Sequence, residues 1–283
     1  MSQFDTAVIP KFHLAAYQQT TPENVGLFEA AKAGDASRVA KWLRDGGCMN
    51  WYNESEGGLT ALHAAAEAGD VETLAILAHF ETDDDAYKPH LELVSTTVKA
   101  TPLHLASTVG ALDCVRFLVK NGAVVDSRNS YGNTPLMLAC VNNHYDIAHF
   151  LIDAGANPKA RNHMKYETPL HMAIAGVTAK ARASLKSNAD DRGDFVDLRV
   201  IMMLLKSGAN VNQPDASGST PLHLLVSIRE NDTSIALGHL LMKHGANPKI
   251  RDVNGRRASD ILRLKAGTGE LLKLLKEHEF FIQ

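Results

Sequence analysis

The sequence has little of what most enzymes, membrane proteins and disulfide-rich domains require. It contains only 3 cysteines in 283 residues, at wide spacings that give neither a disulfide framework nor a Cys-x-x-Cys motif for metal or redox chemistry. So few thiols are typical of a reducing compartment. No apolar run approaches the length of a membrane span, and the N-terminus lacks the basic and then apolar order of a secretory signal. We therefore expect a soluble cytoplasmic or nuclear protein without a membrane partner.

Aromatic residues and net charge are also low. Aromatic side chains make up 6% of the chain, and the formal net charge is −3. A chain so close to neutrality has no broad basic surface, so nucleic acid is not an expected partner. The hydrophobic content of 45% is enough for a sizeable core. Because alanine and leucine dominate this content, close packing of helices is favoured over a β-sandwich.

Catalytic motifs are missing as well. The sequence has no nucleophile elbow, no phosphate-binding loop and no Gly-x-Gly-x-x-Gly motif. It has 13 histidines, but those outside the repeated motif described next show no metal-ligand spacing. Cys114 and Cys140 fall on apolar helical faces and are expected to be buried thiols. We therefore predict no catalytic residues, no metal site and no cofactor, and a protein that is not an enzyme.

A tetrapeptide of the form Thr-Pro-Leu-His, or a close variant, recurs along the chain. It begins at five threonines, separated by 41, 33, 34 and 52 residues: Thr60, Thr101, Thr134, Thr168 and Thr220. Downstream of four of them lies a Gly-Ala pair, beginning at Gly122, Gly155, Gly208 and Gly245. Threonine is suited to cap a helix, proline to its first position and glycine to the left-handed end of the next helix. Each unit thus predicts two helices joined by a short turn.

Both elements resemble the ankyrin repeat, whose unit is about 33 residues long. The resemblance covers almost the whole chain from Glu23 onward. It implies an all-α solenoid of about seven stacked helix-turn-helix repeats with projecting β-hairpin-like loops. It also implies that the histidines of the tetrapeptide are structural and hydrogen-bond to neighbouring backbone; they are His63, His104, His171 and His223.

The expected organisation is an N-terminal extension over 1–22 and a repeat domain over 23–283. The repeats fall at roughly 23–52, 53–92, 93–126, 127–160, 161–212, 213–250 and 251–283, with atypical capping repeats at both ends. Insertions lie near 81–99 and 177–197. The second separates two helices of one repeat and either prolongs them or forms a polar loop that could contact a partner.

The resemblance implies that a partner protein binds to the hairpin tips and the exposed side of the first helices, which together form a concave face. The candidate residues are Ser130, Tyr131, Asn133, Val141 and Asn142 in the fourth repeat and His163, Met164 and Lys165 in the fifth. The fifth hairpin carries one residue more than its neighbour and has Tyr166 where glycine is usual. Tyr166 and Trp51 are either exposed anchors or packed against neighbouring hairpins.

Basic residues fall on or beside the hairpins of repeats four, five and seven, notably Arg128, Arg161 and Arg251. They form either an ordinary solvated face or a broken basic stripe that attracts an acidic segment of the partner. Three function classes remain open: an adaptor or scaffold, an inhibitor that occludes an enzyme or transcription factor, and a substrate-targeting subunit. The last would need a recruiting module, for which few residues remain after Gly269. The chain is expected to be monomeric on its own.

Overall fold

The computed structural model describes residues 19–80, 91–184, 197–226, 232–264 and 269–281. The chain forms two compact units, residues 1–130 and residues 131–283. Within the described ranges the regular elements are helices, and a single isolated β-bridge pairs Asn53 with Leu59. The all-α class predicted from the repeats is confirmed.

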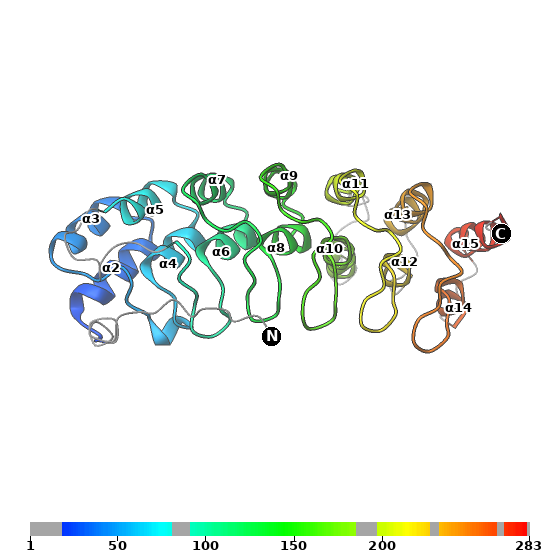
Figure 1. Ribbon diagram of the computed structural model, residues 1–283, viewed down its shortest axis with the longest axis horizontal. Helices are drawn as coiled ribbons and strands as arrows, with labels where there is room; N and C mark the ends of the chain where they lie inside the picture. Colours follow the sequence, from blue (N-terminus) through cyan, green and yellow to red (C-terminus); the bar gives the residue numbers. More distant parts are fainter. Residues whose placement is uncertain (1–18, 81–90, 185–196, 227–231, 265–268, 282–283) are drawn as a thin grey trace. The chain divides into compact units, whose positions relative to one another are not determined.

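The first unit contains two layers of helices (Figure 1). One layer holds α2 (Pro22–Lys32), α4 (Ala61–Ala68) and α6 (Pro102–Val109). The other holds α3 (Ala36–Arg44), α5 (Val71–Ala78) and α7 (Leu112–Lys120), and a short 3-10 helix, η1 (Glu54–Glu56), lies in the loop before α4. Consecutive helices within each layer contact one another, and each first-layer helix also contacts the second-layer helix that follows it.

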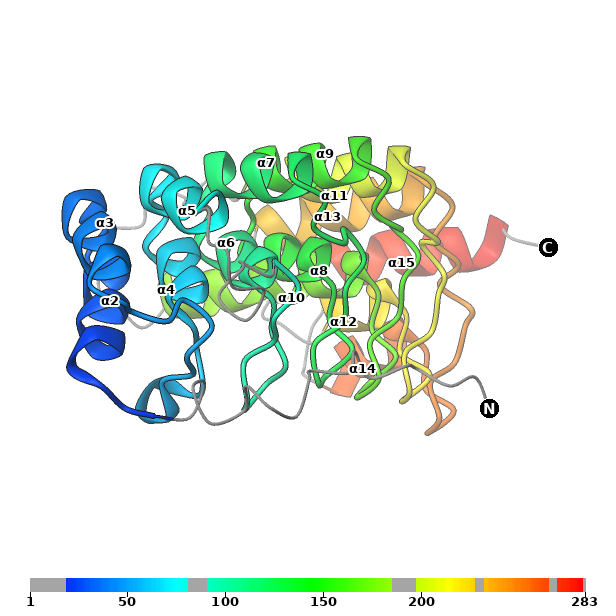
Figure 2. The same ribbon diagram turned by 60° about the vertical axis from the view of Figure 1, so that its left-hand side comes forward.

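The second unit repeats this arrangement (Figure 2). Its first layer holds α8 (Pro135–Val141), α10 (Pro169–Ser184), α12 (Pro221–Leu225) and α14 (Ala258–Leu264). Its second layer holds α9 (Tyr145–Asp153), α11 (Arg199–Lys206), α13 (Asp232–Lys243) and α15 (Glu270–Phe281). The loops before α10, α12 and α14 project from one side of the unit as hairpins (Figure 1). None of the helices in the described ranges combines the length and apolarity that a bilayer crossing requires.

The repeated tetrapeptide starts the first-layer helices as its chemistry predicts. Thr60, Thr101 and Thr220 are N-caps in extended conformation, and each forms a reciprocal capping box with the histidine three residues later. Proline occupies the first turn of α6, α8 and α12, where its missing N–H leaves no bond unmade. The tetrapeptide is therefore primarily a helix-start signal.

Small side chains let the first-layer helices approach closely. Six consecutive residues of α4, from Ala61 to Ala66, are buried. In α10, a Cβ on Gly176 would lie 2.0 Å from the carbonyl oxygen of Val141 in α8. The backbones of α8 and α10 are thus in near contact, and only glycine fits between them.

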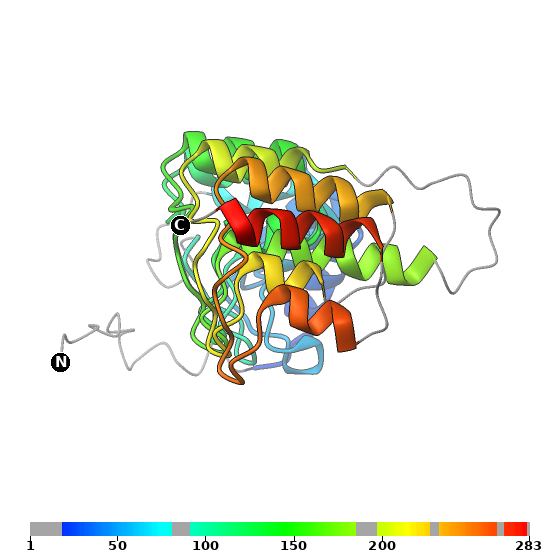
Figure 3. The same ribbon diagram turned by 90° about the vertical axis from the view of Figure 1, so that its right-hand side faces the viewer.

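The two inserted segments are described in part. Residues 177–184 continue α10, which reaches 16 residues, whereas α11 has 8 and begins only at Arg199. Figure 3 shows the end of α10 running on past α12, on the side away from the hairpins. Residues 185–196, the acidic run within 81–90 and residues 1–18 of the N-terminal extension lie outside the described residues. Within that extension, Thr21 caps α2.

Candidate functional site

The histidines of the tetrapeptide are structural, as predicted. Nε2 of His63 lies 2.9 Å from the carbonyl oxygen of Ala100, and Nε2 of His223 lies 3.1 Å from that of Arg256. His171 makes the same contact with Ser219 at 3.3 Å. Each ring thereby links the start of its own helix to the hairpin of the next repeat. Burial lowers the pKa of His63 to about 4 and also lowers the pKa values of His171 and His223, so these rings favour the neutral form.

The three cysteines are buried, as predicted for Cys114 and Cys140. Cys48, Cys114 and Cys140 are free and buried. Burial raises the pKa of Cys114 to about 11 and raises the pKa values of Cys48 and Cys140. A thiol that resists ionisation is a poor nucleophile. In the described part of the chain, no three His, Cys, Asp or Glu side chains come together as a metal site.

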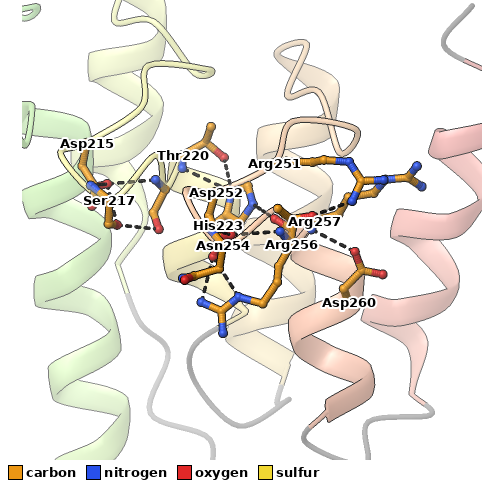
Figure 4. Close-up of polar contacts among 12 residues, drawn as sticks. Asp215, Ser217, Thr220, His223, Arg251, Asp252, Asn254, Arg256, Arg257 and Asp260 are labelled. Carbon is orange, nitrogen blue, oxygen red and sulfur yellow. Dashed lines mark hydrogen bonds and ion pairs between the residues drawn. The ribbon is translucent and has the colours of Figure 1, made fainter.

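An aspartate or asparagine at the start of each hairpin of the second unit closes its turn. Oδ1 of Asp215 accepts hydrogen bonds from the backbone N–H groups of Ser217 and Ser219, both at 2.8 Å. Oδ1 of Asp252 does the same for Asn254 and Arg256, both at 2.9 Å (Figure 4). These side chains replace backbone partners and hold the loop tips in a fixed shape.

The hairpin tips are also joined to one another by backbone hydrogen bonds. In the first unit, the N–H of Ser130 donates to the carbonyl of Val98 at 2.9 Å. The second unit has three such bonds, of 2.9, 2.7 and 3.0 Å: His163 to Tyr131, Ala216 to Lys165 and Val253 to Ser217. The tips therefore form a regular row within each unit, and side chains on neighbouring tips lie next to one another.

The hairpin of the fifth repeat departs from this regularity. Here Oδ1 of Asn162 accepts from the N–H groups of Lys165 and Glu167, at 3.2 and 3.0 Å. Two residues therefore lie between the turn-closing side chain and the first amide that it binds, whereas the next two hairpins have one. Tyr166 takes the position that Gly218 and Gly255 occupy, with a φ of 56°. Left-handed backbone costs a non-glycine residue about 1–2 kcal/mol. The extra residue and the substituted glycine, both noted in the sequence, thus have structural consequences.

The side chains of this hairpin face solvent. Met164 is 66% exposed and Tyr166 is 51% exposed. The guanidinium of Arg161 lies 4.9 Å from the centre of the Tyr166 ring, and its Nε donates to the Tyr166 carbonyl at 3.4 Å. We call Arg161, His163, Met164, Lys165 and Tyr166 the fifth-repeat tip. It lies beside Tyr131, which is 45% exposed on the preceding hairpin.

The other predicted binding residues differ in exposure. Asn142 is half-buried at the end of α8, and its amide donates to the carbonyl of Leu138 at 2.9 Å. Val141 and Asn133 are also half-buried. The remaining three are exposed: Arg128 and Ser130 in the first unit, and Arg251 in the second, beside the last hairpin.

Two arginines beside the last hairpin form ion pairs within the fold. Arg256 forms an ion pair with Asp252 at 2.8 Å, and Arg257 forms one with Glu279 at 3.0 Å. Both arginines lie beside the last hairpin, and their charges are neutralised within the fold. Arg251 donates to the carbonyl of Gly255 of its own hairpin (Figure 4).

The sequence left the role of Trp51 open and did not identify Val253 as an exposed tip residue. Trp51 is only 4% exposed and packs edge-on against Phe28, with ring centres 6.3 Å apart, so it is a core residue. Val253 is 70% exposed at the tip of the last hairpin. An apolar residue inside the turn segment Asp252–Gly255 was the signal that could have identified it.

Family models match most of this repeat pattern. A model described as ankyrin repeats in three copies matches residues 27–126 and 87–162, and a single ankyrin-repeat model matches residues 217–253. The chain therefore belongs to the ankyrin-repeat family. Ankyrin repeats are protein-interaction modules.

Relatives and solved structures agree with this assignment. The chain is 30% identical over 238 residues to the B-cell lymphoma 3 protein homolog of Mus musculus, covering 75% of this chain and 51% of that protein. It is 47% identical over 60 residues to protein phosphatase 1 regulatory subunit 27 of Homo sapiens, covering 21% of this chain and 39% of that protein. The chain thus spans about half or less of the length of these relatives.

Two crystal structures are similar in fold. The ankyrin repeat domain of Bcl-3 superimposes with a TM-score of 0.63 at 20% identity, over 92% of this chain and 99% of that one. The human ASB11 ankyrin repeat domain gives a TM-score of 0.67 at 23% identity, over 92% of this chain and 98% of that one. The predicted ankyrin-repeat fold is therefore confirmed.

Proposed function

We propose that this chain is a non-catalytic adaptor or scaffold that binds a partner protein through the hairpin tips of its second unit. The observation that carries the proposal is the exposure of three large side chains on two adjacent, hydrogen-bonded hairpins: Tyr131, Met164 and Tyr166. Large aromatic and apolar residues supply most of the binding energy of protein interfaces. Because the tips are already held in place, little conformational entropy is lost when a partner binds.

A regulatory subunit that acts on an enzyme is the second candidate. It is favoured by the 47% identity to a phosphatase regulatory subunit over 60 residues. The same surface could serve an inhibitor, because occluding an active site and recruiting a partner require the same kind of complementary face. For either role we expect a cytoplasmic or nuclear location and a monomeric chain.

Affinity capture from the source cell, with identification by mass spectrometry, tests the proposal. The wild-type chain would be compared with a tip variant, Tyr131→Ala/Met164→Ala/Lys165→Ala. A matched control, His149→Ala/Met202→Ala/Lys206→Ala, removes three exposed side chains from the second-layer helices of the same unit. Equal circular dichroism and equal unfolding transitions would establish that all three proteins fold.

We expect a partner that binds the wild type and the control and is lost from the tip variant. A partner held equally by the tip variant would contradict the proposed face. If the captured partner is an enzyme, its activity with and without the chain separates regulation from scaffolding. A partner that belongs to a ubiquitin-transfer or similar assembly would instead support a substrate-targeting role.

A further inference from the structure

We infer that the fifth-repeat tip binds an acidic, extended segment of the partner that carries an apolar side chain. This inference rests on the proposed function and specifies the chemistry that the tip recognises. It is carried by three features of the hairpin: an extra exposed residue, an aromatic residue where the neighbouring hairpins have glycine, and a local excess of positive charge.

The extra residue has no role in closing the turn. The turn of the fifth repeat is closed by Asn162 through the N–H groups of Lys165 and Glu167, just as Asp215 closes the next one through Ser217 and Ser219. His163 and Met164 stand where the next hairpin has Ala216 alone. His163 keeps the backbone bond to the preceding tip. Met164 is the residue left over, and its flexible apolar side chain, 66% exposed, is suited to pack on a partner.

Tyr166 occupies a position where the hairpins on either side use glycine. At Gly132 a Cβ would lie 2.6 Å from the backbone nitrogen of His163, and at Gly218 it would lie 2.9 Å from that of Val253. Glycine is thus required where the following hairpin passes close by. The fifth hairpin, with its extra residue, has room for a side chain at this position. Because a strained residue persists only where the surrounding structure holds it, a strained and exposed tyrosine points to a role in binding.

Arg161 holds the tyrosine in place. Its guanidinium lies over the ring and donates to the backbone carbonyls of Tyr166 and Pro214, both at 3.4 Å. The ring is therefore held in place as an apolar surface with a positive charge over one face. Such a pairing accommodates an apolar side chain and a carboxylate at neighbouring positions of one segment.

The charge of the hairpin is positive. Residues 159–167 carry three cations, Lys159, Arg161 and Lys165, and one acid, Glu167. The carboxylate of Glu167 accepts from the side-chain amide of Asn162 at 3.2 Å and is directed back into its own turn. The Lys165 side chain is exposed, while its backbone is bonded on both sides, to Asn162 and to Ala216. A partner segment with negative charge is complementary to this surface.

Selection from a phage-displayed library of random linear peptides tests the inference, with the full chain as bait. We expect enriched peptides in which Asp or Glu lies next to Leu, Met or an aromatic residue. A labelled synthetic peptide of the enriched sequence should bind about tenfold or more weakly to Met164→Ala, Tyr166→Gly and Lys165→Glu. Its affinity for the wild type should fall as sodium chloride is raised from about 50 to about 500 mM.

Two controls match these variants. Met202→Ala removes an exposed apolar side chain from the second-layer helix α11 of the same unit, and Tyr166→Phe keeps the ring. Both should retain the affinity within about twofold of wild type. Enriched peptides without acidic residues, peptides that bind the three variants as well as they bind the wild type, or no enrichment above the bait-free background would each overturn the inference. A partner that is nevertheless lost from the tip variant in affinity capture would leave the proposed function standing.

Discussion

His63 and Ala100 join two successive repeats of the first unit, with Nε2 of the histidine 2.9 Å from the carbonyl oxygen of the alanine. The other ring nitrogen, Nδ1, accepts from the backbone N–H of Thr60 at 3.2 Å. A neutral imidazole with its proton on Nε2 satisfies both contacts at once. Protonation would add a hydrogen at Nδ1, directed at another donor. The link between the repeats therefore depends on the neutral ring.

Acid should weaken the fold through this histidine. The folded-state pKa of His63 is about 4, against an ordinary value of 6.5, so between these two pH values the unfolded chain binds more protons. The stability that the neutral ring contributes is complete above about pH 6.5 and is lost as the pH falls toward 4. The loss is on the order of 3 kcal/mol, and His171 and His223 shift in the same direction. Urea unfolding between about pH 7 and about pH 4.5 measures this.

His63→Met is the variant that isolates the effect. It copies the fourth repeat, where Met137 is fully buried at the same position of the motif. The variant should be less stable than wild type at neutral pH by about 1–3 kcal/mol, because it loses two buried hydrogen bonds. Its stability should fall less steeply with acid. Equal pH slopes for the two proteins would show that the titration of His63 does not contribute. His149→Ala, at an exposed histidine, is the control.

Replacement of Asp252 should separate turn closure from ion pairing. Asp252→Asn keeps an oxygen for the N–H groups of Asn254 and Arg256, as Asn162 does in its own hairpin. It should cost about 1 kcal/mol or less through the lost ion pair with the part-exposed Arg256. Asp252→Ala leaves both amides without their acceptor and should cost about 2–3 kcal/mol. Denaturant unfolding gives the energies, and amide hydrogen exchange at Asn254 reports the turn directly.

Equal destabilisation by the two variants would instead show that Asp252 stabilises the fold through its charge and not through closure of the turn. Acid provides a second check, because the hydrogen-bonded guanidinium of Arg256 lowers the pKa of Asp252 to about 2 from 3.8. A lowered pKa means that the stabilisation is present above about pH 4 and is lost as the pH falls through 2. The part of the acid sensitivity that is due to Asp252 should be absent in the asparagine variant.

A pair of substitutions at Tyr166 should show the cost of its left-handed backbone. Tyr166→Ala and Tyr166→Gly both remove the ring and its contact with Arg161, but only glycine adopts a φ of 56° without cost. The glycine variant should therefore be more stable than the alanine variant by about 1 kcal/mol in denaturant unfolding. Gly132→Ala should cost about 2 kcal/mol or more, because its Cβ would also meet the His163 backbone. An alanine at 166 as stable as glycine would rule out the strained backbone.

Local features of this chain follow from the sequence. Capping by the repeated threonines and the substitution of Tyr166 for glycine depend on residues within one motif. The backbone contacts of the histidines were implied by the resemblance to the ankyrin repeat. The chemistry of a cap or a left-handed turn needs only a few neighbouring residues, so a repeated motif is enough to predict it. The ankyrin-repeat fold, confirmed by the family models, follows from the period of these local signals.

Features that depend on distant residues could not be predicted in this way. Trp51 and Tyr166 are both aromatic residues at hairpins, yet Trp51 is buried against Phe28 of α2 and Tyr166 is exposed. The positive charge of Arg257, beside the last hairpin, is paired with Glu279, which lies 22 residues further along the chain. Each outcome depends on tertiary packing, which the repeat pattern alone does not specify.

Gly176 offers a test of how tightly the first-layer helices pack. Alanine is the better helix former, so Gly176→Ala should gain about 1 kcal/mol from helix propensity alone. Ala179→Gly, at an exposed position of the same helix, measures the reverse change: the stability lost when glycine replaces alanine without any effect on packing. The Cβ of an alanine at 176 would lie 2.0 Å from the Val141 carbonyl oxygen, a backbone atom that can move only if α8 and α10 separate. Separating them opens the core beneath, and overpacking of this kind costs about 1–3 kcal/mol.

We therefore expect Gly176→Ala to lower the free energy of unfolding by about 1–2 kcal/mol, because the overpacking cost exceeds the gain in helix propensity. Denaturant unfolding of the wild type, Gly176→Ala and Ala179→Gly would give the three energies under one set of conditions. A Gly176→Ala protein as stable as wild type would mean that α8 and α10 can move apart without loss. The close approach of these helices would then be a consequence of the glycine and not a requirement of the fold.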